Sequence, residues 1–127
     1  MPAPTRAGSA LALAALFAAG TAFAHHGWSW AEPEQSELEG VIRSVSLAPP
    51  HPRLEVEDAQ GALWQVDLGN PRQTAASGFA EGSAEPGDAI EILGNRSARE
   101  GELLMKAVRI SIDGQAYDIY PDRIQAP

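Results

Sequence analysis

The sequence has 127 residues, with nine basic and seventeen acidic side chains and a net charge of −8. This length is enough for one domain with one hydrophobic core, and the acidic balance repels phosphate backbones, which argues against nucleic acid as a partner. The sequence has no cysteine, which excludes disulfides and thiolate chemistry, so the core must hold the fold without covalent cross-links.

The first 24 residues have the pattern of a secretory signal peptide. Arg6 supplies a positive charge, residues 10–19 form an uncharged apolar run, and a small-x-small cleavage site ends at Ala24. The run is shorter than the roughly 20 apolar residues that span a bilayer, which predicts cleavage and no stable membrane insertion afterwards. The mature chain then begins at His25. Export of a cysteine-free acidic domain is typical of the bacterial periplasm, which is the predicted location.

Residues 25–35 are predicted to form an N-terminal arm with aromatic and histidine side chains, ahead of a folded domain over residues 36–127. A long first strand is expected over residues 36–47. Its apolar residues change from one parity to the other, and this change predicts a bulge or sharp bend near Arg43. Gly40, in the same strand, allows another backbone to approach closely.

The rest of the chain alternates short apolar strands with turn residues. Prolines end the first strand after residue 47, and Asn70 followed by Pro71 predicts a short helix that ends near Ser77. A polar loop is expected over residues 94–101. Further strands are predicted at residues 54–56, 64–68, 89–93, 103–112 and 115–120.

This order of elements predicts a mostly β fold. Three strands, a short helix and two or three further strands are the order of an OB-fold, a partly open five-stranded Greek-key barrel. We therefore expect a small OB-fold-like barrel of five to six strands with one short helix. An SH3-like barrel and a small β-sandwich are the alternatives.

Three histidines are the candidate metal ligands. Cleavage after Ala24 would leave the α-amine and the imidazole of His25 in one residue, spaced to chelate one ion. Imidazole and amine nitrogens together suit tetragonal Cu(II), and further nitrogens would come from His26 or from His51 in a proline-rich loop. This start is similar to the histidine brace of secreted copper proteins. The alternative is a frayed terminus with solvated histidines, and an exposed turn residue at position 51.

Two tryptophans follow the histidines. Trp28 and Trp30 share a parity, so on an extended segment both would lie on one side and clamp the arm onto the domain. The alternative is an aromatic surface for a sugar, a peptide or a base. Trp64 and Met105, in predicted strands, are expected in the core, although a methionine thioether is also a ligand for Cu(I).

The remaining candidates are cationic or phenolic. Arg96, Arg99 and Arg123 are candidates for anion contact, but in so acidic a chain we expect them to form surface ion pairs, each worth under about 1 kcal/mol. Tyr117 and Tyr120 are expected to cover one end of the barrel.

No catalytic motif stands out. The sequence has no marked nucleophilic serine with a base, no spaced pair of carboxylates and no Gly-rich phosphate loop. We therefore predict a non-enzymatic periplasmic binding module that binds copper or another divalent metal through His25, His26 and His51. The alternative is a metal-free interaction domain that binds a protein, a small ligand or an envelope component.

Several motifs resemble those of a family of small exported bacterial proteins of unknown function. The match rests on a His-His-Gly-Trp start after the signal peptide and a Tyr-Pro-Asp-Arg tail, at residues 25–28 and 120–123. Other matching segments lie at residues 38–42, 50–51, 87–88 and 96–97. The first loop has Pro49 where the family pattern has Asn, and His51 is kept. The resemblance implies a periplasmic location and brings no activity with it.

Overall fold

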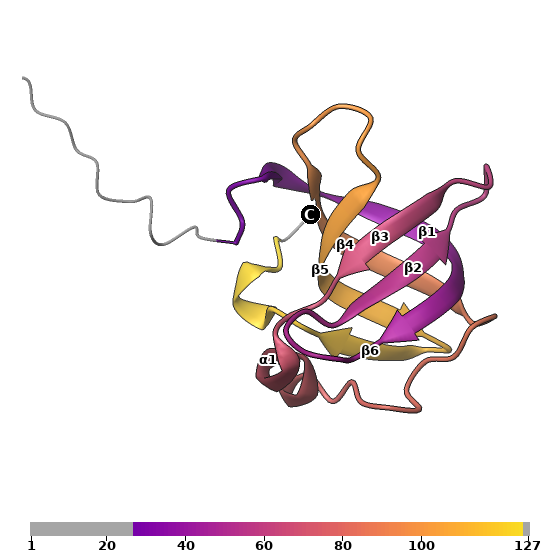
Figure 1. Ribbon diagram of the computed structural model, residues 1–127. Coiled ribbons are helices and arrows are strands. Elements are labelled where there is room, and N and C mark those ends of the chain that lie inside the picture. The colour runs from indigo at the N-terminus through magenta and orange to yellow at the C-terminus, as the bar shows by residue number, and fades with distance from the viewer. Residues whose placement is uncertain (1–26, 126–127) are drawn as a thin grey trace, which may run out of the picture.

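The structure, a computed structural model, describes residues 27–125 as a curled sheet with one short α-helix (Figure 1). The six strands form one sheet in the order β3-β2-β1-β4-β5-β6. The predicted β-rich class with one short helix is confirmed. The elements are β1 (Ala31–Ser46), β2 (Arg53–Glu57), β3 (Leu63–Asp67), α1 (Pro71–Ala76), β4 (Ala89–Ser97), β5 (Leu104–Ile112), β6 (Gln115–Asp118) and the 3-10 helix η2 (Pro121–Arg123).

Strand β1 is long and bent, as its apolar pattern predicts. It pairs with β4 along its first part and with β2 along its last part, and its register with β2 shifts between Ile42 and Ser44. This shift confirms the predicted bulge near Arg43. A side chain at Gly40 would collide with the backbone carbonyl of Glu57, so the close approach expected there is also confirmed.

Strand β1 begins earlier than predicted. Ala31 pairs with Ser97 and Gln35 pairs with Asn95, so residues 31–35 belong to the sheet and not to a separate arm. The backbone between these two pairs is irregular, and it includes Pro33. The sequence conceals this strand because proline and three polar residues give it no apolar alternation.

Strand β4 also extends beyond its predicted end at Leu93. It continues to Ser97, where a loop was predicted from residue 94. Gly94 meets the Lys106 carbonyl too closely for a side chain, and the β4–β5 register shifts at this glycine. The strand predicted from residue 103 begins one residue later, at Leu104, and Leu103 is exposed.

The core is formed by the inward faces of the strands and closed at one end by the helix region. Asn70 accepts a hydrogen bond from the Gln73 amide and caps α1, as predicted. Gln73 fastens α1 to the end of β6 by donating to the Ile119 carbonyl, and Phe79 is buried beyond the helix. Within residues 27–125, neither helix is long and apolar enough to cross a membrane. The fully buried residues include Ile42, Leu54, Val56, Val66, Met105, Val108 and Ile110.

Candidate functional site

A row of polar side chains crosses the outer face of the sheet. Strand pairing places Gln35 beside Asn95, Asn95 beside Lys106, Lys106 beside Asp67, and Asp67 beside Arg53. Directly paired residues project from the same face of a sheet, so β1, β4, β5, β3 and β2 each contribute one polar group to the row.

The N-terminal turn covers part of this row. Residues 27–30 form a turn, closed by a hydrogen bond from the Ala31 amide to the Trp28 carbonyl, so the extended conformation predicted for the two tryptophans is wrong. Trp28 is nevertheless anchored. Its ring meets Tyr120 edge-on at a centroid distance of 4.9 Å, and the Arg123 guanidinium lies over it at 4.1 Å. Lys106 Nζ lies 5.2 Å from the same ring.

The charges around Trp28 are close together and partly removed from water. Burial lowers the pKa of Lys106, while the charge of Asp67 raises it and the charge of Arg123 lowers it further. Burial likewise raises the pKa of Tyr120. Among the described residues, no carboxylate oxygen lies within 4.0 Å of a Lys106 or Arg123 nitrogen. Two cations therefore share one indole without a direct anionic partner in this part of the chain.

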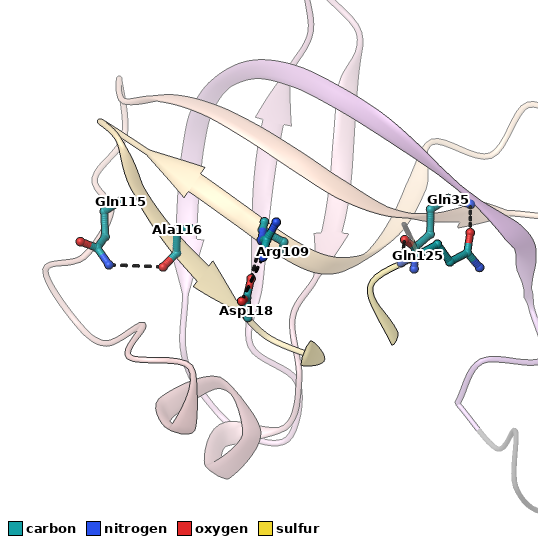
Figure 2. Close-up of polar contacts among 6 residues, drawn as sticks. All are labelled: Gln35, Arg109, Gln115, Ala116, Asp118 and Gln125. Atoms are coloured by element: carbon teal, nitrogen blue, oxygen red, sulfur yellow. Dashed lines mark hydrogen bonds and ion pairs between the residues drawn. The ribbon is translucent and has the colours of Figure 1, made fainter. Parts of the chain in front are cut away.

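The segment after η2 is tied to β1 by glutamine hydrogen bonds (Figure 2). The Gln125 amide donates to Gln35 Oε1 at 3.0 Å, and the Gln35 amide donates to Gln125 Oε1 at 3.3 Å. Gln35 Nε2 also donates to the Arg123 carbonyl at 2.6 Å. These bonds hold η2 and the residues after it next to the N-terminal turn.

A cleft of about 600 Å³ lies between these two segments. Trp28 and Arg123 form part of its wall, and Gln35 and the buried Asn95 form another part. Asn95 Nδ2 donates to the Glu32 carbonyl at 2.9 Å, which holds the irregular start of β1 beside the cleft. We call this space the terminal cleft. Its walls are Trp28, Ser29, Ala31, Glu32, Pro33, Gln35, Asn95, Asp122, Arg123, Ile124 and Gln125.

The three predicted metal ligands have different outcomes. His25 and His26 lie outside the described residues, immediately before Gly27. His51 is exposed in the loop between β1 and β2. Residues 27–125 contain no group of three or more His, Asp or Glu side chains arranged to hold a metal ion.

The start of β2, which follows the loop that holds His51, lies beside the end of β3. The Leu68 amide donates a hydrogen bond to the Pro52 carbonyl at 3.0 Å. Asp67, the residue before Leu68, pairs with Arg53 on one side and with Lys106 on the other. Strand β3 therefore lies between the start of β2 and Lys106, whose ammonium lies 5.2 Å from the Trp28 ring.

Of the three arginines that were predicted to form surface ion pairs, one forms such a pair among the described residues. Arg99 pairs with Glu102 at 3.5 Å. Arg96 instead lies over the ring of Trp64 at 5.0 Å, and Arg123 lies over Trp28. Tryptophan faces attract cations, and these contacts replace the surface ion pairs that the acidic composition suggested.

The core positions predicted for Trp64 and Met105 are confirmed, since both are buried. Tyr117 meets Phe79 edge-on at 5.3 Å, and Tyr120 meets Trp28 edge-on. That the two tyrosines cover one end of a barrel stays a prediction.

Sequence reasoning missed Lys106, Gln35, Asn95 and Gln125. No spacing marks them, because they lie on different elements and meet through strand pairing. One feature of the sequence could have identified Lys106. It lies between the apolar Met105 and Ala107 in a predicted strand, and alternation along a strand then places its side chain on the face away from the core.

A contact that fixes the last strand lies apart from the terminal cleft. Arg109 of β5 donates to Asp118 of β6 through two nitrogens (Figure 2). Its hydrogen bond lowers the pKa of Asp118 and raises the pKa of Arg109. This pair fastens β6 to the sheet and leaves Tyr120 and η2 to continue towards Trp28.

The comparison with protein families gives a single assignment. No curated protein matches the chain. A family model described as a family of unknown function matches residues 12–104, and the Tyr-Pro-Asp-Arg tail lies beyond this match. Because the match covers most of the sequence, the chain belongs to this family, DUF6152.

Proposed function

We propose that this protein is a small exported binding module of the bacterial periplasm, built on an OB-like barrel and without enzymatic activity. Five strand pairings support the barrel: β1 pairs with β2 and with β4, β3 pairs with β2 and, in parallel, with β5, and β4 pairs with β5. These pairings form a continuous ring of five strands. The position of α1 between β3 and β4 is also that of the OB order.

The first binding function that we propose is a copper site at the mature N-terminus. His25 would supply its amine and imidazole, and His26 and His51 would supply further nitrogens. The observation that carries this proposal is the anchoring of Trp28 by Tyr120 and Arg123. A single residue separates His26 from Trp28, and preorganisation of a chain beside a binding group lowers the entropy cost of binding.

A Cu(II) titration of the processed protein, followed by EPR, tests this site. We expect nitrogen ligation at one site per chain. A version with one extra residue before His25 removes the amine chelate and should bind copper more weakly, and His51→Gln should change the ligand pattern. Equal copper affinity with and without the extra residue would show that the N-terminal chelate is wrong.

A second candidate function is metal-free binding of a small ligand in the terminal cleft. Its volume of about 600 Å³ falls within the range of about 300–1,000 Å³ typical of small-molecule sites. Metal-free protein would be immobilised and exposed to periplasmic extract, and the retained molecules would be identified by mass. Retention that persists under chelation supports this function. Loss of every retained molecule under chelation contradicts it.

A further inference from the structure

We propose that the terminal cleft binds small molecules that carry a single carboxylate, and that Arg123 is the residue that receives it. This inference rests on the second function proposed above and specifies its ligand class. It uses none of the three histidines of the proposed copper site, although Trp28 and Arg123 also anchor the turn beside them.

Arg123 has the geometry of a carboxylate receptor. Its guanidinium lies over the Trp28 ring at 4.1 Å, and it forms part of the wall of the cleft. A guanidinium carries its N–H donors in a planar fork, from which a carboxylate accepts two in parallel. Within residues 27–125 the Arg123 side chain donates no hydrogen bond and forms no ion pair, and its main chain is fixed by Gln35 and Tyr120. The donor group is therefore held in place and unused.

Lys106 adds a second positive charge at the same indole. Its ammonium lies 5.2 Å from the Trp28 ring and 5.7 Å from the Tyr120 ring. The charge of Arg123 contributes to lowering the Lys106 pKa, which shows that the two cations repel each other. An anion at Arg123 would reduce this repulsion. Within residues 27–125 no carboxylate oxygen lies within 4.0 Å of either cation, which is a local departure from the net charge of −8.

The rest of the lining limits the charge and shape of the ligand. Glu32 and Asp122 also form part of the wall, so a dianion would meet about twice the repulsion that a single carboxylate meets there. Pro33, Ile124 and the Trp28 ring provide apolar surface for the body of the ligand. A planar carboxylate with an apolar body fits these groups better than an inorganic anion.

Benzoate and benzamide form a matched pair of probes, because they have the same ring and differ in charge. Each would be titrated at pH 7 into protein freed of metal by chelation and then desalted, since the chelator is itself a carboxylate. Amide shifts in 1H–15N NMR spectra report both affinity and position. We expect benzoate to shift residues around the terminal cleft and to bind more tightly than benzamide.

Arg123→Gln removes the charge and one planar donor set. We expect it to weaken benzoate binding by about tenfold or more, as for a hydrogen bond to a charged group worth at least about 1.5 kcal/mol. Arg123→Lys keeps the charge and should still lose affinity, because the paired donors are gone. Arg72→Gln removes an exposed charge on α1 and should leave affinity unchanged. The NMR spectrum of each variant also shows whether it is folded.

Three results would overturn the inference. Equal binding of benzamide and benzoate at the terminal cleft would reject carboxylate recognition and leave the proposed ligand-binding function standing. Benzoate binding that is unaffected in folded Arg123→Gln would reject Arg123 as its receptor. Failure of both probes to shift any residue of the cleft would also reject the stated ligand class.

Discussion

Removal of the Trp28 ring should release the N-terminal turn and destabilise the domain. An edge-to-face aromatic pair contributes about 0.5–1.5 kcal/mol beyond burial, and an exposed cation–π contact contributes about 0.5–1 kcal/mol. Trp28 makes one such aromatic contact, with Tyr120, and faces Arg123 and Lys106. We therefore expect Trp28→Ala to lower the free energy of unfolding by about 1.5–3.5 kcal/mol.

Urea unfolding followed by circular dichroism measures this loss. A double-mutant cycle with Arg123→Ala isolates the contact between the cation and the ring, for which we expect a coupling of about 0.5–1 kcal/mol. Leu63→Ala, at an exposed position in β3, is the control and should change stability by less than about 0.5 kcal/mol. A Trp28→Ala loss no larger than that of the control, or a coupling near zero, would refute the anchoring of the turn and weaken the case for the copper site.

Three further predictions concern the fold. Gly40→Ala should cost about 1–3 kcal/mol or more by overpacking, because the added methyl meets the backbone of β2. Gly61→Ala, with open space but a φ of +83°, should cost only about 1 kcal/mol in the same urea assay, and the reverse order would contradict this account. Asn70→Ala should lower stability by about 0.5–2 kcal/mol through loss of the helix cap, whereas unchanged thermal unfolding would show that the cap is dispensable. The hydrogen bond from Trp64 lowers the Asp58 pKa from 3.8, so Asp58 contributes stability above this pH that is lost as pH falls through its folded pKa. The stability gap between wild type and Asp58→Asn should therefore shrink in acid, and a gap that is constant from pH 7 to pH 2 would contradict the shift.

Local chemistry explains why much of the fold is readable from the sequence. The parity change in β1, the prolines after it, and Asn70 before Pro71 each act on their immediate neighbours. Their effects therefore appear in the structure where the sequence predicts them. The boundaries of β1 and β4 were missed because residues 31–35 and 94–97 are strands by pairing with each other, without apolar alternation of their own.

The candidate site also has one part that the sequence predicts and one part that only the fold creates. The histidines and tryptophans after the predicted cleavage site can be identified without the fold, because a signal peptide and the residues that follow it are read directly from the sequence. The meeting of Trp28, Lys106 and Arg123 depends on the pairing of β1 with β4 and of β4 with β5, and on the return of the chain after β6. Such contacts join segments far apart in the sequence, and their closure is favourable only when the whole core forms. The terminal cleft is therefore a property of the tertiary structure, since no single segment carries more than one side of it.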